Sequence, residues 1–369
     1  MTADVPESSG RVVSIDALRG FDMFWITGGT AFFERLFNWI GSPLLEPLNR
    51  QMEHSSWDGF TAYDLIFPLF LFIVGASLPF ALSRRKERGD PVGKLWRHVL
   101  RRTVTLLFLA MIYAGLLDFD FSDFRYAGVL QRIALCYFFA GTIVLYAGIR
   151  GQALIAAAIL LAYWGLMTLV PVPGIGAGVL TPEGNLAGYI DRLLLPGSFC
   201  CYDFGDNEGI LSTLPAISTT LLGVLSSHWL RTVRSQNSKV LGLAAAGVVS
   251  LVAALAWNPF FPINKLMWTS SYVLFAGGWS LLLLALFYWV IDVQGYRRWA
   301  FFFIVIGMNA ITLYVGQRLF DFETISDIFI HGFVDYLGSF KPVFQSFCEL
   351  MVKWLFLYFL FRQKIFLKA

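Results

Sequence analysis

The segment Phe60–Leu82 is apolar over a length sufficient to cross a bilayer as one helix. Its only charged residue is Asp64. Burying a carboxylate in a membrane is costly, so we expect Asp64 to face protein or a watery cavity and to have a partner. His54 stands just outside this predicted span and is one of only four histidines in the chain. An imidazole at the mouth of a membrane helix, with an acid one turn inside it, is a candidate reaction centre.

Apolar runs of this kind recur along the chain. The composition, 57% hydrophobic and 14% charged, differs from that of soluble domains, in which about a quarter of the residues are charged. We therefore predict an all-α integral membrane protein, a polytopic bundle of about ten transmembrane helices that forms a single domain over residues 1–369. The predicted spans are Ile15–Leu36, Phe60–Leu82, Val99–Leu116, Val129–Tyr146, Ala153–Val170, Ile210–Trp229, Val240–Trp257, Ser271–Ile291, Phe301–Val315 and Phe347–Phe361. A shorter apolar segment, Ile325–Leu337, is expected to be re-entrant or interfacial.

The charges of the connections predict the orientation of the bundle. Basic residues concentrate at one side by alternation: Arg11, Arg84, Arg85, Lys86, Arg88, Arg101, Arg102, Arg150, Arg231, Arg234, Lys239, Arg297, Arg298, Arg362, Lys364 and Lys368. Acidic residues concentrate at the other: Asp118, Asp120, Asp123, Glu183, Asp191, Asp203, Asp206, Glu208, Asp321, Glu323, Asp327 and Asp335. By the positive-inside rule both termini are cytoplasmic, and His54 and the long loops 38–59 and 171–209 face outward.

Several classes of protein and site are excluded or disfavoured. The net charge of +3 is too small to indicate nucleic-acid binding. Residues Met1–Gly10 lack the pattern of a cleaved signal peptide, so the first span is expected to insert itself. The cysteines, at positions 136, 200, 201 and 348, lack zinc-ligand spacing, and no metal is predicted. A bond between the adjacent Cys200 and Cys201 is not expected, whereas pairing of either with Cys348 stays open.

His54 and Asp64 are the predicted catalytic pair. Imidazole suits proton transfer, or nucleophilic attack on an activated acyl group, near neutral pH. Asp64 would orient the ring and stabilise its charged form. The alternatives are an interfacial His54 in a solvated loop and a structural ion pair between Asp64 and Arg132. Of the other histidines, His98 and His228 are interpreted as interfacial, and His331 has no assigned role.

Arginines at both ends of the bundle are candidate anion-binding groups. Arg19 shares a helix face with Asp16 and Asp22, and it either completes an ion-pair ladder or receives a phosphate that enters from the cytoplasm. Arg125 lies at the outer mouth of the fourth span, while Gln131 and Arg132 lie within it. A buried arginine needs an acid or a ligand.

Five further polar or aromatic residues are candidates for substrate binding. Each is also compatible with helix capping or interfacial anchoring. They are Trp57, Glu208, Asn264, Lys265 and Asn309.

Taken together, seven stretches resemble the transmembrane acyltransferase family of heparan-α-glucosaminide N-acetyltransferase and its bacterial relatives. They are Ser14–Gly20, His54–Gly59, Asp64–Pro68, Gly128–Arg132, Glu208–Thr213, Pro262–Trp268 and Gly307–Ala310. They follow the family's order over nearly the whole chain. The histidine motif followed by Asp-Leu-x-Phe-Pro is the specific part.

The resemblance implies acetyl transfer from cytoplasmic acetyl-CoA to the amino group of a glucosamine-type sugar or short glycan on the outer side. It implies that His54 is the catalytic histidine, that Asp64 is the acid of the second motif, and that Arg125 helps to bind acetyl-CoA or to shape its tunnel. The compact form is similar to the bacterial members, which implies the inner membrane, contact with lipid, and a homodimer.

Two hypotheses of function follow. In the first, the chain is a membrane acyltransferase in which His54 either carries the acetyl group or deprotonates the attacking amine. In the second, it exports small glycans without acyl chemistry, and His54 and Asp64 form a proton-coupled pair. A purely structural subunit is disfavoured because it would gain nothing from a desolvated polar cluster.

Overall fold

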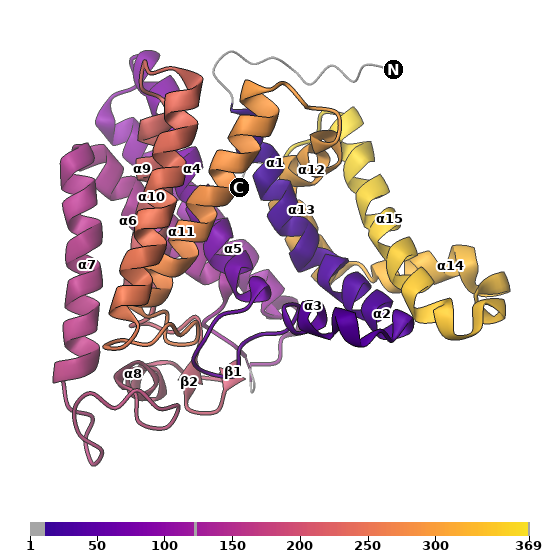
Figure 1. The fold of residues 1–369 in the computed structure, drawn as a ribbon, viewed down its shortest axis with the longest axis horizontal. Helices are drawn as coiled ribbons and strands as arrows, with labels where there is room; N and C mark the ends of the chain where they lie inside the picture. Colours follow the sequence, from indigo (N-terminus) through magenta and orange to yellow (C-terminus); the bar gives the residue numbers. More distant parts are fainter. Residues whose placement is uncertain (1–11, 122–123, 368–369) are drawn as a thin grey trace.

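The computed structural model describes residues 12–121 and 124–367. Arg11, Asp123 and Lys368, which contribute to the charge argument, lie outside the described residues. The described chain is almost entirely helical, with one two-stranded hairpin (Figure 1).

The elements follow one another along the chain with short connections. The α-helices are α1 Val13–Phe24, α2 Thr30–Ile40, α3 Glu46–Arg50, α4 Ile66–Glu87, α5 Val92–Tyr113, α6 Val129–Tyr146, α7 Ile149–Leu169, α8 Leu186–Leu194, α9 Thr213–Leu230, α10 Gln236–Trp257, α11 Ser270–Phe287, α12 Ala300–Met308, α13 Ala310–Leu319, α14 Phe322–Val334 and α15 Lys341–Arg362. The antiparallel strands are β1 Cys201–Tyr202 and β2 Gly205–Asp206. Short 3₁₀ turns cover Pro43–Leu45, Ala62–Leu65, Leu116–Asp118 and Asp335–Phe340, and π turns cover Trp25–Gly29 and Tyr288–Val293.

Each of the ten predicted spans falls on a helical segment, and α6 has the predicted bounds. Within the described residues, six segments are long and apolar enough to cross a membrane, and the pair α12 and α13, bent by 67°, makes a seventh. These helices and the composition make the chain an all-α membrane protein. The number of ten spans and the orientation of the termini stay predictions.

The three predicted spans outside this set have identifiable departures from a simple apolar helix. The first is broken at Gly28, where φ is 136° within the π turn between α1 and α2. The third, α5, carries Lys94, Arg97, Arg101 and Arg102. The sixth, α9, buries many small hydroxyl side chains. Such residues let helices approach closely in a membrane.

The interior of the bundle depends on close helix pairs, and α4 packs along α9 while α10 packs along α11. A Cβ on Gly223 would lie 1.9 Å from the carbonyl oxygen of Phe72, and one on Gly75 would lie 1.9 Å from that of Thr220. The backbones of α4 and α9 are therefore in contact at two glycines, Gly75 on α4 and Gly223 on α9.

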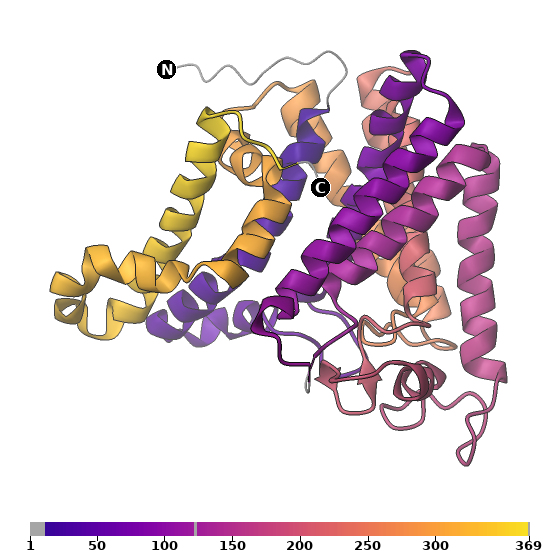
Figure 2. The ribbon, with the colours of Figure 1, turned by 180° about the vertical axis from the view of Figure 1, so that it is seen from behind.

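The polar connections gather at two opposite ends of the bundle. The short helices α3 and α8 and the β1–β2 hairpin lie at one end, and the connection between α4 and α5 lies at the other (Figures 1 and 2). The loops 38–59 and 171–209 thus share an end, as alternation of the spans requires. The predicted interfacial segment forms α14, a short helix that packs against α15.

The α4–α9 contact yields a stability test. Replacing Gly223 with Ala should destabilise the protein by about 1–3 kcal/mol, because the added methyl group must push two backbones apart. Thermal unfolding of the purified protein in detergent, followed by size-exclusion chromatography, measures the effect. Gly165→Ala is the matched control, since a Cβ there meets nothing within 4 Å. It should leave stability unchanged or raise it. Equal stability of the two variants would contradict the packing argument.

Candidate active site

His54 and Asp64 form a hydrogen-bonded pair at the mouth of α4. His54 Nδ1 lies 2.8 Å from Asp64 Oδ1, and the imidazole stacks on Tyr63 with ring centroids 4.4 Å apart. The Asp64 side chain is fully buried, whereas that of His54 is 51% exposed. An acid behind the ring and an accessible ring edge in front are the arrangement that acid–base or nucleophilic chemistry requires.

Asp64 is held by the chain segment that leads into α4. Its Oδ2 accepts hydrogen bonds from the backbone N–H groups of Ser55 and Thr61, at 3.2 and 3.1 Å, and from the Thr61 hydroxyl at 3.2 Å. These bonds form a capping box at the start of the 3₁₀ turn. Because the backbone donors occupy one oxygen, the other is directed at His54. The carboxylate therefore fixes the orientation of the imidazole.

Lys265 brings a second basic group to the same carboxylate. Its Nζ lies 2.9 Å from His54 Nδ1, 3.2 Å from His54 Nε2 and 3.3 Å from Asp64 Oδ1. Burial lowers the pKa of the Lys265 ammonium, against the opposing charges of Asp64 and Glu208. One carboxylate thus serves two basic groups.

Arg125 ties a second set of polar groups to this end of the bundle. Its Nε donates to Asp206 Oδ2 at 2.8 Å, and its Nη2 donates to Asp206 Oδ1 at 2.6 Å and to Glu208 Oε2. Burial opposes the charge of Arg125, but these carboxylates raise its pKa above the ordinary value. The forked contact holds the β1–β2 hairpin and the segment after it against the start of α6.

These groups open into one cavity of about 230 Å³, which we call the His54 cavity. Its polar lining comprises His54, Tyr63, Arg125, Asn207, Glu208 and Lys265, and Cys200 and Cys201 lie beside them in the wall. Its apolar lining comprises Met23, Ile26, Ile66, Phe67, Phe70, Val129, Leu130, Ile133, Ile311 and Tyr314. The volume lies below the roughly 300–1,000 Å³ of sites for drug-sized ligands, and it suits a group the size of one sugar ring.

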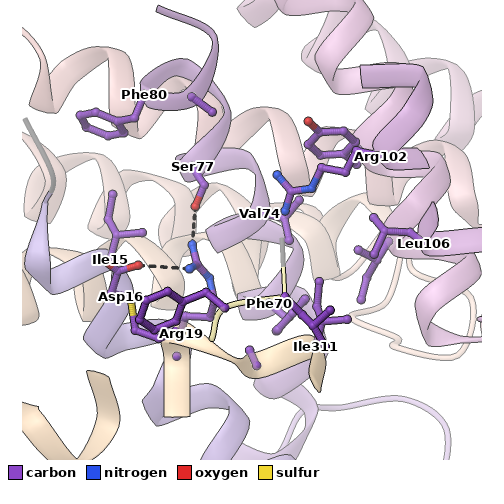
Figure 3. Close-up of a pocket in the computed structure, with 18 of the residues that line it drawn as sticks. Ile15, Asp16, Arg19, Phe70, Val74, Ser77, Phe80, Arg102, Leu106 and Ile311 are labelled. Atoms are coloured by element: carbon purple, nitrogen blue, oxygen red, sulfur yellow. Dashed lines mark hydrogen bonds and ion pairs between the residues drawn. The ribbon is translucent and has the colours of Figure 1, made fainter. Parts of the chain in front are cut away.

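A larger cavity of about 920 Å³, here called the Arg19 cavity, lies between α1, α4, α5 and α13. Arg19, His98, Arg101 and Arg102 are among its lining residues, with Asp16 as the acidic one. Arg19 is held by Asp16 Oδ1 at 3.1 Å and by Ser77 Oγ at 2.5 Å, and Arg102 lies across the cavity from it (Figure 3). The guanidinium of Arg102 lies over the Tyr137 ring, and its buried Nε has no hydrogen-bond partner within the described residues. A lining with this excess of positive charge suits an anionic ligand.

The two cavities meet within the bundle. Phe70, Ile133 and Ile311 line both of them. These three side chains come from α4, α6 and α13. They lie where the basic cavity and the His54 cavity adjoin, and we call them the constriction. A ligand that is anionic at one end and apolar along its length would match this sequence of linings.

The remaining predicted residues are distributed around these cavities. Asn264 is fully buried and donates to Asp58 Oδ1 at 3.1 Å, while its Oδ1 accepts from Met267 N–H at 2.8 Å, so it holds the Lys265 loop. Trp57 donates to the carbonyl of Leu180 at 3.0 Å. Neither Asn264 nor Trp57 lines the His54 cavity. Both support the loops that carry its polar groups.

Arg132, Gln131 and Asn309 lie outside the polar cluster. Arg132 is buried, donates to Ser212 Oγ and to the carbonyl of Gly209, and lies over the Trp268 ring at 4.9 Å. The cation beside Asp64 is thus Lys265 and not Arg132, whose guanidinium donates to Ser212 and Gly209. Gln131 lines neither cavity. Asn309 stands at the bend between α12 and α13 and bonds the backbone of Ile365 and Leu367.

Sequence reasoning missed a helical face that lines the Arg19 cavity. His98, Arg101, Arg102 and Thr105 on α5 all line it. Their spacing of i, i+3, i+4 and i+7 marks one side of a helix, and this signal was present in the sequence. His98, interpreted above as interfacial, belongs to this face. His228 does not line the cavity, and its Nε2 lies 3.0 Å from Gln152 Oε1.

The prediction that Cys200 and Cys201 are not bonded to each other was wrong. Cys200 and Cys201 are joined by a disulfide, and Cys348 and Cys136 are free. Cys201 has φ of 81° at the start of β1. Spacing along the chain does not reveal that conformation.

The chain is similar to known proteins. Residues 11–147 match a family described as Domain of unknown function (DUF5009). Heparan-alpha-glucosaminide N-acetyltransferase from Homo sapiens is 31% identical over 326 aligned residues, which cover 73% of this chain and 49% of the human protein. The Mus musculus protein of the same name is 30% identical over the same shares.

The chain is homologous to heparan-alpha-glucosaminide N-acetyltransferase. The resemblance seen in the motifs is thereby confirmed. The chain spans about half the length of these two homologues.

Asp191 on α8 yields a pH test of the loop that carries Asp206 and Glu208. Its buried carboxylate accepts from the N–H groups of Ile210 and Asp206, at 2.9 and 3.3 Å. Burial raises its pKa from 3.8 to about 6, against those two bonds. Because ionisation is disfavoured in the folded state, its stabilising contribution is complete below about pH 4 and is lost as the pH rises through about 6.

Thermal unfolding of the wild type and Asp191→Asn between about pH 4 and pH 8 measures this loss. The wild type should lose stability relative to the variant up to about pH 6–7, and the difference should then be constant. A difference that does not vary with pH would contradict the assignment.

Proposed function

We propose that the chain is a membrane-embedded acetyltransferase that moves the acetyl group of acetyl-CoA to the amino group of a glucosamine-type sugar. The observation that carries the proposal is the His54–Asp64 pair in a small cavity that meets a larger basic cavity inside the bundle. The donor enters from the cytoplasmic end and the acceptor from the opposite end. Homology to an N-acetyltransferase supports the reaction class.

The Arg19 cavity is suited to the nucleotide part of acetyl-CoA. Arg19, Arg101 and Arg102 carry permanent positive charges toward a space of about 920 Å³. Guanidinium groups bind phosphate through paired hydrogen bonds, so these arginines recognise the phosphates. The pantetheine arm then passes Phe70, Ile133 and Ile311 and brings the thioester to His54. Arg125 supports the far end of this path through its contacts with Asp206 and Glu208.

In direct transfer, the acceptor amine attacks the thioester carbonyl while His54 takes its proton. The new C–N bond gives a tetrahedral oxyanion, after which the C–S bond breaks and the leaving CoA thiolate takes the proton from His54. Asp64 accepts a hydrogen bond from the Nδ1–H of His54 and stabilises the imidazolium. Lys265, within 3.2 Å of His54 Nε2, supplies a positive charge beside the developing oxyanion.

In the covalent route, His54 itself attacks the thioester carbonyl, the C–S bond breaks and CoA leaves as the thiolate. The amine then attacks the carbonyl of the acetyl-imidazole and displaces His54. This route gives ping-pong kinetics and an acetylated protein of higher mass in the absence of acceptor. Both routes use the same side chains, so intact mass measurement distinguishes them.

Glu208, Asn207 and Lys265 are the polar groups suited to the hydroxyl groups of an amino sugar. All three line the His54 cavity. Location in a bacterial inner membrane and a homodimeric assembly complete the proposal, on the strength of the family resemblance.

Removing the catalytic pair tests the reaction. His54→Ala should lower kcat by about 10²–10⁴-fold with glucosamine and acetyl-CoA, because it removes the base or nucleophile. Asp64→Asn should lower kcat by about 10²-fold or more, because it no longer favours the reactive tautomer and the charged ring. Product mass over a panel of amino sugars and short glycans is the measurement.

The exposed His331 on α14 provides the control, and His331→Ala should retain full activity. Full activity in His54→Ala would overturn the catalytic assignment. Substrate flux driven by a pH gradient, without release of CoA, would instead favour the exporter hypothesis.

The donor cavity gives a separate prediction. Arg102→Gln should raise the KM for acetyl-CoA about tenfold with little change in kcat, because a phosphate contact contributes to binding rather than to chemistry. Arg150→Gln, at the exposed start of α7, is the matched control. An unchanged KM in Arg102→Gln and in Arg19→Gln would show that the nucleotide binds elsewhere.

A further inference from the structure

The wall of the His54 cavity contains a covalent feature that the proposed chemistry does not use. Cys200 and Cys201, joined by a disulfide between adjacent residues, both line this cavity together with His54 and Lys265. Neither cysteine lines the Arg19 cavity. The disulfide therefore belongs to the half of the path that lies beyond the constriction, where the acceptor binds.

The surrounding hairpin holds the two cysteines in place. Cys201 pairs with Asp206 in the β1–β2 hairpin, and Cys200 N–H donates to Asp206 Oδ2 at 3.0 Å. Arg125 binds the same carboxylate with two nitrogens. Cys201 adopts φ of 81°, a region that side-chain-bearing residues seldom occupy. Backbone in such a conformation persists where its surroundings over-determine it, and it clusters at ligand-binding sites.

The disulfide offers an apolar surface beside the polar groups of the cavity wall. It is compact and apolar and carries no N–H or O–H donor, whereas Asn207, Glu208 and Lys265 lie in the same lining. A sugar ring likewise has apolar C–H faces and a polar edge of hydroxyl groups. An apolar wall with a few polar groups beside it is the usual composition of a small-molecule site.

We propose that the Cys200–Cys201 disulfide is a specificity-determining wall of the acceptor site, against which the C–H face of the amino-sugar ring packs. The inference rests on the proposed acetyl transfer and adds the group that selects a ring-shaped acceptor. The wall lies at the predicted outer end of the bundle, where an oxidising compartment preserves a disulfide.

The proposal makes acceptor binding sensitive to reduction. A dithiol such as dithiothreitol gives two electrons and two protons to the S–S bond and closes to its own cyclic disulfide, which leaves two thiols at positions 200 and 201. The two side chains then separate and the flat wall is lost. The donor side keeps its lining, because neither cysteine contributes to the Arg19 cavity.

Steady-state kinetics of the purified full chain test this, with product mass as the readout. The protein is reduced with dithiothreitol, the reagent is removed without air, and peptide mapping confirms the two thiols. The KM for glucosamine should rise about fivefold to tenfold while the KM for acetyl-CoA changes less than about twofold. Reoxidation should restore the KM for glucosamine.

Variants separate the wall from a general structural effect. The double variant Cys200→Ser with Cys201→Ser should match the reduced protein and should not respond to dithiothreitol. Cys348→Ser removes a free thiol and should behave as the wild type. Equal loss of activity toward both substrates, or no change in either KM, would overturn the inference. Absence of acetyl transfer by the untreated protein would overturn the proposed function, and the inference with it.

Discussion

The structure depends on one buried carboxylate that serves two basic groups. Asp64 is fully buried where α4 begins, and an isolated charge there would be strongly unfavourable. Backbone donors from Ser55 and Thr61 satisfy one of its oxygens, and His54 and Lys265 face the other. The loops that carry these residues, 53–61 and 258–269, are thereby drawn to the same end of the bundle. The hydrogen bond from Asn264 to Asp58 joins the same two loops.

A second carboxylate organises the other wall of the cavity. Asp206 binds Arg125 with both oxygens and also accepts the N–H groups of Cys200 and Glu208. The hairpin, the disulfide and Glu208 are therefore held relative to α6. Two acidic residues, each with several donors, hold the loops that form the polar wall of the cavity, and such multiple bonding is what gives a loop site the rigidity that chemistry needs.

The separation of the two cavities has a physical consequence for any donor that spans them. In the proposed path, the apolar arm of the donor passes Phe70, Ile133 and Ile311, which line both cavities. The phosphates stay on the basic side of this path, because desolvating them among apolar side chains would be costly. A reactive thioester could then reach His54 while the charged end of the molecule stayed behind.

The sequence by itself determined the helical class and singled out His54 and Asp64 as candidates, because apolar length and an isolated charge are local properties of the chain. It also placed Lys265 and Glu208 among the substrate-binding candidates, through motifs rather than geometry. Only the tertiary structure decided which of these residues meet. It brought Lys265 to His54 across 211 positions, left Asn309 at a helix bend, and joined Cys200 to Cys201. Those outcomes depend on loop conformation and on contacts between distant segments, and neither has a period or spacing that a single sequence can reveal.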